Sequence, residues 1–403
     1  MQKIHADIVV VGAGLAGLTA TLALLKNGFK TVNIAPLAAR RDQRTTALWS
    51  DSIEFLKSLD ADQVFQEHGS PIRTIRMIDA TDRLIRSPQI EFHASEIELE
   101  EFGYNIGNHE LSISLRRIIN EINLEVFSEA SVGEMSPAED RTELTLDTGQ
   151  KIVAGLVVGA DGRNSGVRKA SGISVRNWSY PQTAIVLNFK HSVPHDDVST
   201  EFHTRAGPFT MVPLGKGLSS LVWVERPELA EQIKRSERAD LESRIEQKMH
   251  SMLGKIEIVS DIQSFPLSGM IANSFGSGQT MLVGEAAHVF PPIGAQGLNL
   301  GIRDIKAVAN LVKTDRPTDS LISEYNKMRR SDIESRTASV DLMNRSLLSD
   351  FLPIQMLRGM GMAALASIGP LRRTAMREGV APGRSLRTIT DSLANRLNKR
   401  KFG

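Results

Sequence analysis

The stretch from residue 284 to residue 304, GEAAHVFPPIGAQGLNLGIRD, constrains the fold more than any other part of the chain. It contains four glycines and the adjacent pair Pro291 and Pro292, and it follows a short apolar run at 280–283. Helical spacing resumes at Leu298. The pattern predicts a strand, a rigid turn and a helix whose N-terminus points at a ligand. Unpaired N–H groups and the positive end of the helix dipole would face a flat, negatively charged group.

A second strand, turn and helix open the chain. A β-branched run at 7–11 precedes Gly12, Gly14 and Gly17, and helical spacing begins at Leu18. The three glycines suit a tight turn, the close approach of a phosphate and close packing of the helix on the strand, which together are the fingerprint of dinucleotide binding. The alternative is a tight turn that holds no ligand.

One part of that fingerprint is missing. An acidic residue usually ends the second strand and binds the adenosine ribose, yet the chain has Ala35 and Pro36 there. The omission argues against a plain NAD dehydrogenase more than against a flavoprotein, which holds its cofactor along its whole length. Arg44, in the polar loop that follows, could reach the pyrophosphate or the ribose, and the alternative is a solvated loop arginine.

A third turn, at Asp161 and Gly162, closes the apolar strand at 152–158 and precedes a helix at Val167. An Asp-Gly pair by itself indicates an ordinary turn. Its position between a strand and a helix predicts instead a carboxylate at the tip of another turn that faces a ligand.

The pattern changes to antiparallel strands from 178 to 269, with a helical insert at 227–253, and we interpret this region as a substrate domain. Period-2 alternation predicts that Phe209, Met211 and Pro213 share one face and that Trp223 joins them. These four residues are candidates for the wall of a substrate pocket. The alternative, that they are ordinary sheet core, has at least equal weight.

Composition limits the classes of function. The chain has 48 basic and 47 acidic residues, which gives no general reason to expect a nucleic-acid partner. It has no cysteine, so disulfides, thiolate metal sites and iron–sulfur clusters are excluded, and we expect no metal site. The chain begins without a leader-like segment, so we expect a cytoplasmic protein. The apolar stretch 359–371 is too short to span a bilayer.

Positive charge is concentrated at the end of the chain. Residues 384–403 hold six basic residues and one acidic residue, a net charge of +5. Leu386, Ile389, Leu393 and Leu397 recur at helical spacing among them, which predicts a basic amphipathic helix. We hypothesise peripheral docking on the inner face of an anionic membrane, or on partner enzymes. A frayed, solvated terminus is an equally weighted alternative.

Three motifs occur in a fixed order: GAGLAG at 12–17, GADGRNS at 159–165 and the stretch 284–304. With these motifs the chain resembles the FAD-dependent aromatic hydroxylases of the para-hydroxybenzoate hydroxylase fold, and among them it looks most like the ubiquinone-biosynthesis hydroxylases. The likeness extends from about residue 5 to residue 375. It implies an α/β fold in which a Rossmann-like FAD-binding domain is interlaced with an antiparallel-sheet substrate domain and followed by a C-terminal helical segment.

The expected division has four parts. These are an FAD-binding domain at 1–176 with substrate-domain strands inserted around 70–110, a substrate domain at 177–278, the flavin loop and helix of the FAD-binding domain at 279–320, and C-terminal helices with the basic tail at 321–403.

The resemblance also implies a set of cofactor contacts. Glu285 replaces the aspartate that usually holds the ribityl chain, and Ala35 is a second departure that bears on adenosine affinity. The N–H groups from Gly294 to Asn299 would meet the flavin edge on which reduction places negative charge. The implied cofactor-binding positions, together with Arg44, are Gly12, Gly14, Gly17, Asp161, Gly162, Gly284, Glu285, Gly297, Leu298 and Asn299.

The implied reaction uses NAD(P)H to reduce FAD, after which O₂ adds at the flavin C4a and the hydroperoxide transfers oxygen to an electron-rich ring. Pro291, Pro292 and Gly294 are the candidate catalytic residues at the flavin edge, because a proline-rich segment is rigid and excludes water. For His288 we favour a structural role over that of a general base.

The expected substrate is the aromatic ring of a polyprenyl phenol or quinone precursor of ubiquinone. Two alternatives stay open. One is an FAD-dependent reductase of prenyl chains, and the other is a non-catalytic FAD-binding subunit of a biosynthetic complex, which Ala35 and Glu285 make plausible.

Overall fold

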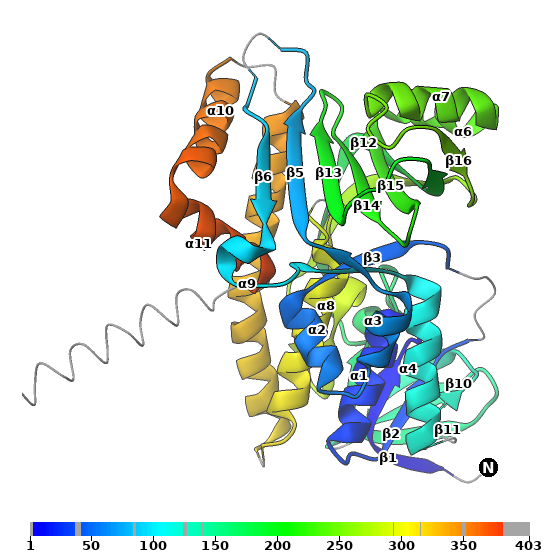
Figure 1. Ribbon diagram of the computed structural model, residues 1–403. Helices are drawn as coiled ribbons and strands as arrows, with labels where there is room; N and C mark the ends of the chain where they lie inside the picture. The colour runs from blue at the N-terminus through cyan, green and yellow to red at the C-terminus, as the bar shows by residue number, and fades with distance from the viewer. Residues whose placement is uncertain are drawn as a thin grey trace, which may run out of the picture.

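A lower sheet and an upper sheet, joined by a small third sheet and one long helix, form the body of the molecule (Figure 1). The basic amphipathic pattern at 386–397 lies outside the described residues. The protein is described by a computed structural model over residues 3–36, 42–83, 86–123, 127–138, 140–292, 294–314, 316–348 and 352–381.

The lower sheet, sheet A, is built around β1 (Ile4–Val11), which pairs in parallel with β2 (Thr31–Ile34) and β11 (Lys151–Gly159). β19 (Thr280–Leu282) continues the parallel order beyond β11. Val9 of β1 is fully buried, as expected for a parallel strand covered on both faces. The other strands are β8 (Phe127–Ser128), β9 (Val132–Ala138), β10 (Arg141–Leu146) and β18 (Gly276–Ser277).

Three helices of the lower body pack together. α1 (Leu15–Lys26) contacts both α4 (Asn108–Ile122) and α8 (Gln296–Leu311). α1 starts after Gly14 and α4 after Gly107, and neither start has a side-chain cap. The first-turn N–H groups of α1 are therefore available to a ligand. In α4, the amide of Asn108 already donates a hydrogen bond of 2.9 Å to the carbonyl of Arg44. The short helix α5 (Gly166–Ala170) follows β11.

The upper sheet, sheet C, has the strand order β20-β17-β12-β15-β14-β13-β5-β6, with β16 paired to β12. Its members β5 and β6 come from the stretch 70–110, where the sequence predicts strands of this sheet. β20 comes from the stretch 284–304, a membership that the sequence does not predict. The strands are β5 (Thr74–Asp79), β6 (Ile90–His93), β12 (Val175–His191), β13 (Val198–His203), β14 (Pro208–Pro213), β15 (Leu218–Glu225), β16 (Ile256–Ile258), β17 (Gln263–Ala272) and β20 (His288–Val289).

The two faces of sheet C have different neighbours. The outer face is covered by α6 (Pro227–Arg235) and α7 (Arg238–Lys248), at the upper right of Figure 1. The opposite, inner face meets small sheet B at its lower end. Sheet B is made of β3 (Thr45–Trp49), β4 (Ser70–Ile72) and β7 (Gly103–Gly107), and α2 (Ser50–Lys57), α3 (Gln63–His68) and the 3-10 turn η1 (Ala94–Ile97) lie in the same stretch of chain.

Three helices complete the described chain. α9 (Thr318–Leu348) contacts β18 and β19 of sheet A, and through Asn344 it donates a hydrogen bond of 2.8 Å to Gln182 of sheet C. α10 (Leu352–Ser367) and α11 (Gly369–Val380) lie along the edge strand β6. Among the helices that are described, none has the length and apolarity needed to cross a membrane.

Candidate functional site

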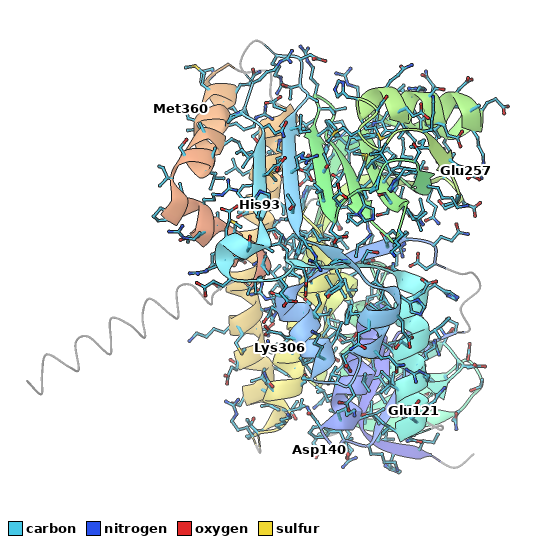
Figure 2. All side chains as sticks on the ribbon, in the orientation of Figure 1. His93, Glu121, Asp140, Glu257, Lys306 and Met360 are labelled. Atoms are coloured by element: carbon cyan, nitrogen blue, oxygen red, sulfur yellow. The ribbon has the colours of Figure 1, made fainter. Side chains whose placement is uncertain are left out.

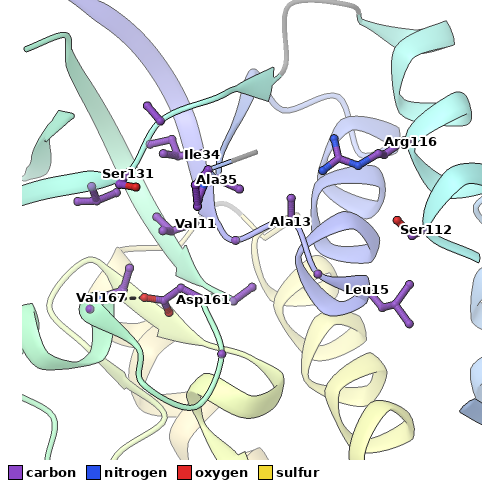
Figure 3. Close-up of a pocket in the computed structure, with 18 of the residues that line it drawn as sticks. Val11, Ala13, Leu15, Ile34, Ala35, Ser112, Arg116, Ser131, Asp161 and Val167 are labelled. Carbon is purple, nitrogen blue, oxygen red and sulfur yellow. Dashed lines mark hydrogen bonds between the residues drawn. The ribbon is translucent and has the colours of Figure 1, made fainter. Parts of the chain in front are cut away.

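A pocket of about 940 Å³ opens where the first two glycine turns meet the end of β2 (Figure 3). It is lined by the turn from Gly12 to Leu15, by Ala35 and Pro36, and by Asp161 and Gly162. The place where an acidic residue usually binds the ribose is therefore part of the pocket, and it carries no carboxylate.

The glycines of the first turn serve different purposes. Gly12 has φ +115°, and an added Cβ would overlap the carbonyl of Ala160. A Cβ on Gly17 would likewise overlap the carbonyl of Gly12, so both positions pack backbone against backbone. A Cβ on Gly14 would meet nothing within 4 Å. Protein packing does not require a glycine there, but the close approach of a pyrophosphate does.

The second turn places an unsatisfied acceptor at the pocket. Oδ2 of Asp161 accepts a hydrogen bond of 3.1 Å from the amide of Val167, which Figure 3 shows. Oδ1 of Asp161 is buried without a hydrogen-bond partner. A buried acceptor of this kind needs a donor, which a ribose or ribityl hydroxyl would provide. The adjoining Gly162 has φ +77°.

The third turn is fastened to the first two. Gly284 has φ +59°, and a Cβ added to it would lie 3.1 Å from Cβ of Ala16 in α1. Arg168, which follows the second turn, is buried and donates a hydrogen bond of 2.8 Å to the carbonyl of Ala286 and one of 2.9 Å to the carbonyl of Arg163. The three turns thus converge. No pattern in the sequence indicates this role of Arg168.

Asp304 anchors the third turn from helix α8. Its carboxylate accepts hydrogen bonds from the amide of Gly284 (2.9 Å), from His288 (2.7 Å) and from Nε of Arg329 (2.6 Å). Burial alone would raise the pKa of the Asp304 carboxyl, but the charges of His288 and Arg329 and the hydrogen bonds lower it. His288 therefore lies in a buried structural network, the role that the sequence favours for it.

The segment that leads from Gly284 to the start of α8 is called the flavin-edge loop here, after the role that the resemblance implies for it. A side chain of α8 ties this loop to sheet B. Oδ1 of Asn299 accepts a hydrogen bond of 2.9 Å from the amide of Trp49, and Nδ2 donates to the carbonyls of Ala47 (2.8 Å) and Ala295 (2.6 Å). Asn299 thus positions the start of α8. In the same loop, Pro291 is buried, Leu298 is half-buried, and Pro292, Gly294 and Gly297 are exposed.

Arg44 lines an adjoining recess of about 530 Å³ and not the glycine-lined pocket. Its guanidinium makes two hydrogen bonds to Asp42, of 2.9 and 2.8 Å, and lies 5.7 Å from the ring centre of Phe265. The hydrogen bond and charge of Asp42, together with the charge of Glu285, raise the pKa of Arg44. Glu285 itself is exposed on the third turn.

Helix α4 contributes pocket residues that the sequence reasoning missed. His109, Ser112 and Arg116 line the pocket from one face of α4, and Figure 3 shows the Arg116 side chain directed into it. Their spacing of three and four residues is the available signal, because it places polar side chains on one face of the helix. Arg116 is a positively charged lining residue of the kind that binds phosphate groups.

Three of the four candidates for the substrate-pocket wall lie on the outer face of sheet C, which α6 and α7 cover. Phe209, Met211 and Trp223 are buried in the apolar cluster between the sheet and α6–α7, with Phe209 and Trp223 paired across the strands. Pro213 is buried, and its carbonyl accepts a hydrogen bond of 2.8 Å from Asn105. Helices α6 and α7 cover the face on which Phe209, Met211 and Trp223 lie. The described residues contain no group of side chains suited to hold a metal ion.

Comparison with known proteins adds sequence and fold relationships. A family model described as FAD binding domain matches residues 5–338. The ubiquinone hydroxylase UbiL of Rhodospirillum rubrum is 31% identical, and the match covers 93% of this chain and 89% of that protein. The 3-demethoxyubiquinol 3-hydroxylase of Escherichia coli is 29% identical, with 92% and 97% covered.

Solved structures share the fold at low sequence identity. The p-nitrophenol 4-monooxygenase of Pseudomonas putida superposes with a TM-score of 0.77 at 18% identity, covering 95% of this chain and all of that one. A Klebsiella pneumoniae HpxO variant complexed with FAD gives 0.76 at 15% identity, covering 94% and 100%.

Proposed function

This chain belongs to the FAD binding domain family, as an FAD-dependent monooxygenase, and from that membership we propose that it hydroxylates the aromatic ring of a polyprenyl phenol or quinone precursor in ubiquinone biosynthesis. The observation that carries the proposal is the similarity, along almost the whole chain, to relatives named as ubiquinone hydroxylases. FAD is the cofactor, and NAD(P)H is the co-substrate typical of the family.

The glycine-lined pocket fits FAD. The open space at Gly14 and the N-terminus of α1 suit the pyrophosphate, Arg116 would neutralise part of its charge, and Oδ1 of Asp161 would accept a hydrogen bond from a sugar or ribityl hydroxyl. Because β2 is followed by Ala35 and carries no carboxylate there, we assign adenosine binding to two polar side chains of the pocket, Ser112 of α4 and Ser131, which directly precedes β9. Bound FAD, once reduced, supplies the activation of dioxygen.

The protein's own part in the reaction is to position groups and exclude water. Asp304 and Asn299 fix the two ends of the flavin-edge loop, so the amides at the start of α8 keep one orientation. Preorganised N–H groups can stabilise developing negative charge without the cost of reorganising solvent. We propose that Pro291, Pro292 and Gly294 form the edge of the reaction site, where the two prolines present no competing N–H group.

Neither alternative function is favoured, because the relatives are named as hydroxylases and monooxygenases. The test supplies the purified, FAD-loaded protein with NADH, a prenylated phenol and ¹⁸O₂. We expect one ¹⁸O atom in the product by mass spectrometry. Reduction of a prenyl double bond without ¹⁸O would indicate the reductase, and bound FAD with no turnover of any prenylated phenol would indicate the non-catalytic subunit. Deleting the gene should make the corresponding quinone precursor accumulate.

We further propose that α10 and α11 dock on an anionic membrane surface, from which a long-chained substrate would enter. Leu357 and Met360 of α10 are 71% and 67% exposed, and Figure 2 shows Met360 on the outer side of the helix. Exposed cationic side chains at Arg373 and Arg377 follow on α11. An apolar surface beside positive charge is the pattern of an interfacial helix on anionic lipid. The net charge of +5 in residues 384–403 adds to the attraction.

A further inference from the structure

A row of directly paired side chains crosses the inner face of sheet C. It consists of Val186, Val222, Thr210, Glu201 and Met77, each opposite the next in the registers of β12, β15, β14, β13 and β5. We call these five residues the inner row. All five are half-buried, whereas the residues that alternate with them on the outer face are packed beneath α6 and α7. The inner row is therefore less tightly covered than the opposite face.

The inner row lies between sheet B and the C-terminal helices. Two residues beyond Val186, Asn188 donates a hydrogen bond of 3.1 Å to the carbonyl of Gln43. Its pairing partner Ser220 accepts one of 3.2 Å from Asn105 of sheet B. At the other end of the row, Arg358 of α10 lies 2.5 Å from the carboxylate of Asp79. A ligand on the inner row would thus be flanked at one end by sheet B, whose Trp49 donates a hydrogen bond to Asn299 at the start of α8, and at the other end by α10.

Glu201 is the only charged member of the inner row. Its Oε1 lies 2.9 Å from Nε2 of His203, and its Oε2 accepts a hydrogen bond of 3.1 Å from the Thr210 hydroxyl. Burial alone would raise the pKa of Glu201, but the hydrogen bonds from His203 and Thr210 and the charge of His203 lower it. A carboxylate has about four acceptor sites, and these contacts fill two. The Glu201 side chain keeps 15% of its surface exposed, compared with 7% for His203.

An ordinary structural ion pair would explain the contact between Glu201 and His203. It would not explain why a carboxylate with two unfilled acceptor sites lies in a row of mainly aliphatic side chains. The direct neighbours of Glu201 across the sheet are Thr210 and Met77. Keeping a carboxylate only 15% exposed beside an aliphatic side chain is costly unless its remaining acceptor sites find donors. A phenol offers one strong donor on an apolar ring, which matches a carboxylate at one position of a row whose members other than Thr210 are aliphatic.

We propose that Glu201, held in place by His203 and Thr210, accepts the hydrogen bond of the substrate's ring hydroxyl, while the aliphatic members of the inner row contact the ring and its apolar chain. The inference rests on the proposed function for the choice of a phenol as ligand. A hydrogen bond from the hydroxyl to a carboxylate increases the electron density of the ring, which favours attack by an electrophilic oxygen. The position of Glu201 thereby also sets the orientation of the ring on the sheet.

The test compares a phenol with its methyl ether, which has lost the donor. The probes are 2-farnesylphenol and 2-farnesylanisole, and calorimetry measures their Kd on FAD-loaded protein. We expect the wild type to bind the phenol about tenfold or more tightly than the ether, as for a hydrogen bond to a charged group. Glu201→Gln should reduce that ratio to about twofold, because a neutral acceptor bonds more weakly. Glu257→Gln, the same change at an exposed position of β16, should leave the ratio unchanged.

Thr210→Val provides a second variant if Glu201→Gln loses FAD or unfolds. It keeps the carboxylate but removes one of its hydrogen bonds, and should lower the ratio about threefold. Equal affinity for phenol and ether in the wild type, no binding of either probe, or an unchanged ratio in both variants would overturn the proposal. If the ratio falls in Glu201→Gln but no ¹⁸O enters a phenol, the binding site stands and the hydroxylase function fails. If a phenol is hydroxylated but the wild type binds the phenol and the ether equally well, the hydroxylase function stands and only the proposed binding site is excluded.

Discussion

The Asp304 carboxylate lies 2.7 Å from Nε2 of His288, and the two side chains are 0% and 1% exposed. The same carboxylate binds the amide of Gly284, at the opposite end of the flavin-edge loop from helix α8. One buried side chain therefore fixes both the entry to the loop and the helix that follows it. This loop carries the residues that would lie against the flavin ring.

Replacing Asp304 by Asn should destabilise the protein by about 3–5 kcal/mol, because Arg329 would keep its buried charge and lose a partner. FAD affinity should fall as well. Urea denaturation with and without FAD measures both effects. Asp60→Asn is the control, since its carboxylate is 74% exposed and its surface ion pair contributes at most about 1 kcal/mol. A variant Asp304→Asn as stable as Asp60→Asn would contradict the anchoring role.

Acid should remove the contribution of Asp304. Its folded-state pKa lies below the ordinary value of 3.8, so its stabilisation is complete above that pH and is lost as the pH falls through the folded-state pKa. The free energy of unfolding, measured from pH 6 down to pH 3, should decrease at the acid end. In Asp304→Asn the decrease should be smaller, and identical slopes for the two proteins would exclude Asp304 as its source.

Gly14 and Gly12 should respond differently to alanine. Gly14→Ala places a Cβ in open space and should change the stability of the FAD-free protein by less than about 1 kcal/mol. It should weaken FAD binding by more than about 1.4 kcal/mol, a factor of ten, because the methyl group would occupy the space of the pyrophosphate. Gly12→Ala should instead destabilise the FAD-free protein, because its φ is +115°. Thermal melts and FAD titration separate the two effects, and unaltered FAD binding in Gly14→Ala would place the pyrophosphate elsewhere.

Arg116→Gln should weaken FAD binding about ten- to a hundredfold through loss of a charged hydrogen bond to phosphate, and should make binding less dependent on salt. The neighbouring Arg117 provides a matched control. Its side chain is 51% exposed and faces Glu121, so Arg117→Gln should bind FAD normally. Fluorescence titration of FAD at two salt concentrations is the measurement. Equal losses in both variants would indicate a general charge effect and not a contact.

The double substitution Leu357→Glu and Met360→Glu should reduce co-sedimentation with vesicles that contain phosphatidylglycerol, because it places charge on the proposed docking surface. Truncation after Gly383 should reduce it further by removing the basic tail. Leu342→Glu on α9, which is 72% exposed outside that surface, is the control. Unchanged binding of both the double variant and the truncated protein would exclude membrane docking by these segments.

The fold class could be predicted from the sequence because its signals are local. β-branched runs, glycines at turns and helical spacing each extend over about ten residues, and the resulting assignment to the flavin-dependent hydroxylase fold is confirmed by the family match and the solved structures. The order of the three motifs also sufficed to predict FAD, which the family match confirms.

Contacts between distant segments could not be predicted in this way. Asp304, Arg329 and Arg168 are charged residues within helices, and their spacing resembles that of solvated positions until the fold brings backbone carbonyls and amides to them. An alternating pattern also does not show which face of a strand in sheet C is covered by helices and which could line a pocket. Phe209 and Trp223 show the required alternation, but α6 and α7 cover their face.

Helix α9 contacts sheet A near one end and sheet C near the other. With 31 residues it is a stiff rod of about 46 Å. We expect this helix to hold sheets A and C at a constant separation. A bulky ligand would then not enter through a hinge between the two sheets. We expect the conformational fluctuations that admit such a ligand to occur beyond the end of α9, at helix α10. Movement of α10 would leave the cofactor and sheet C aligned with each other.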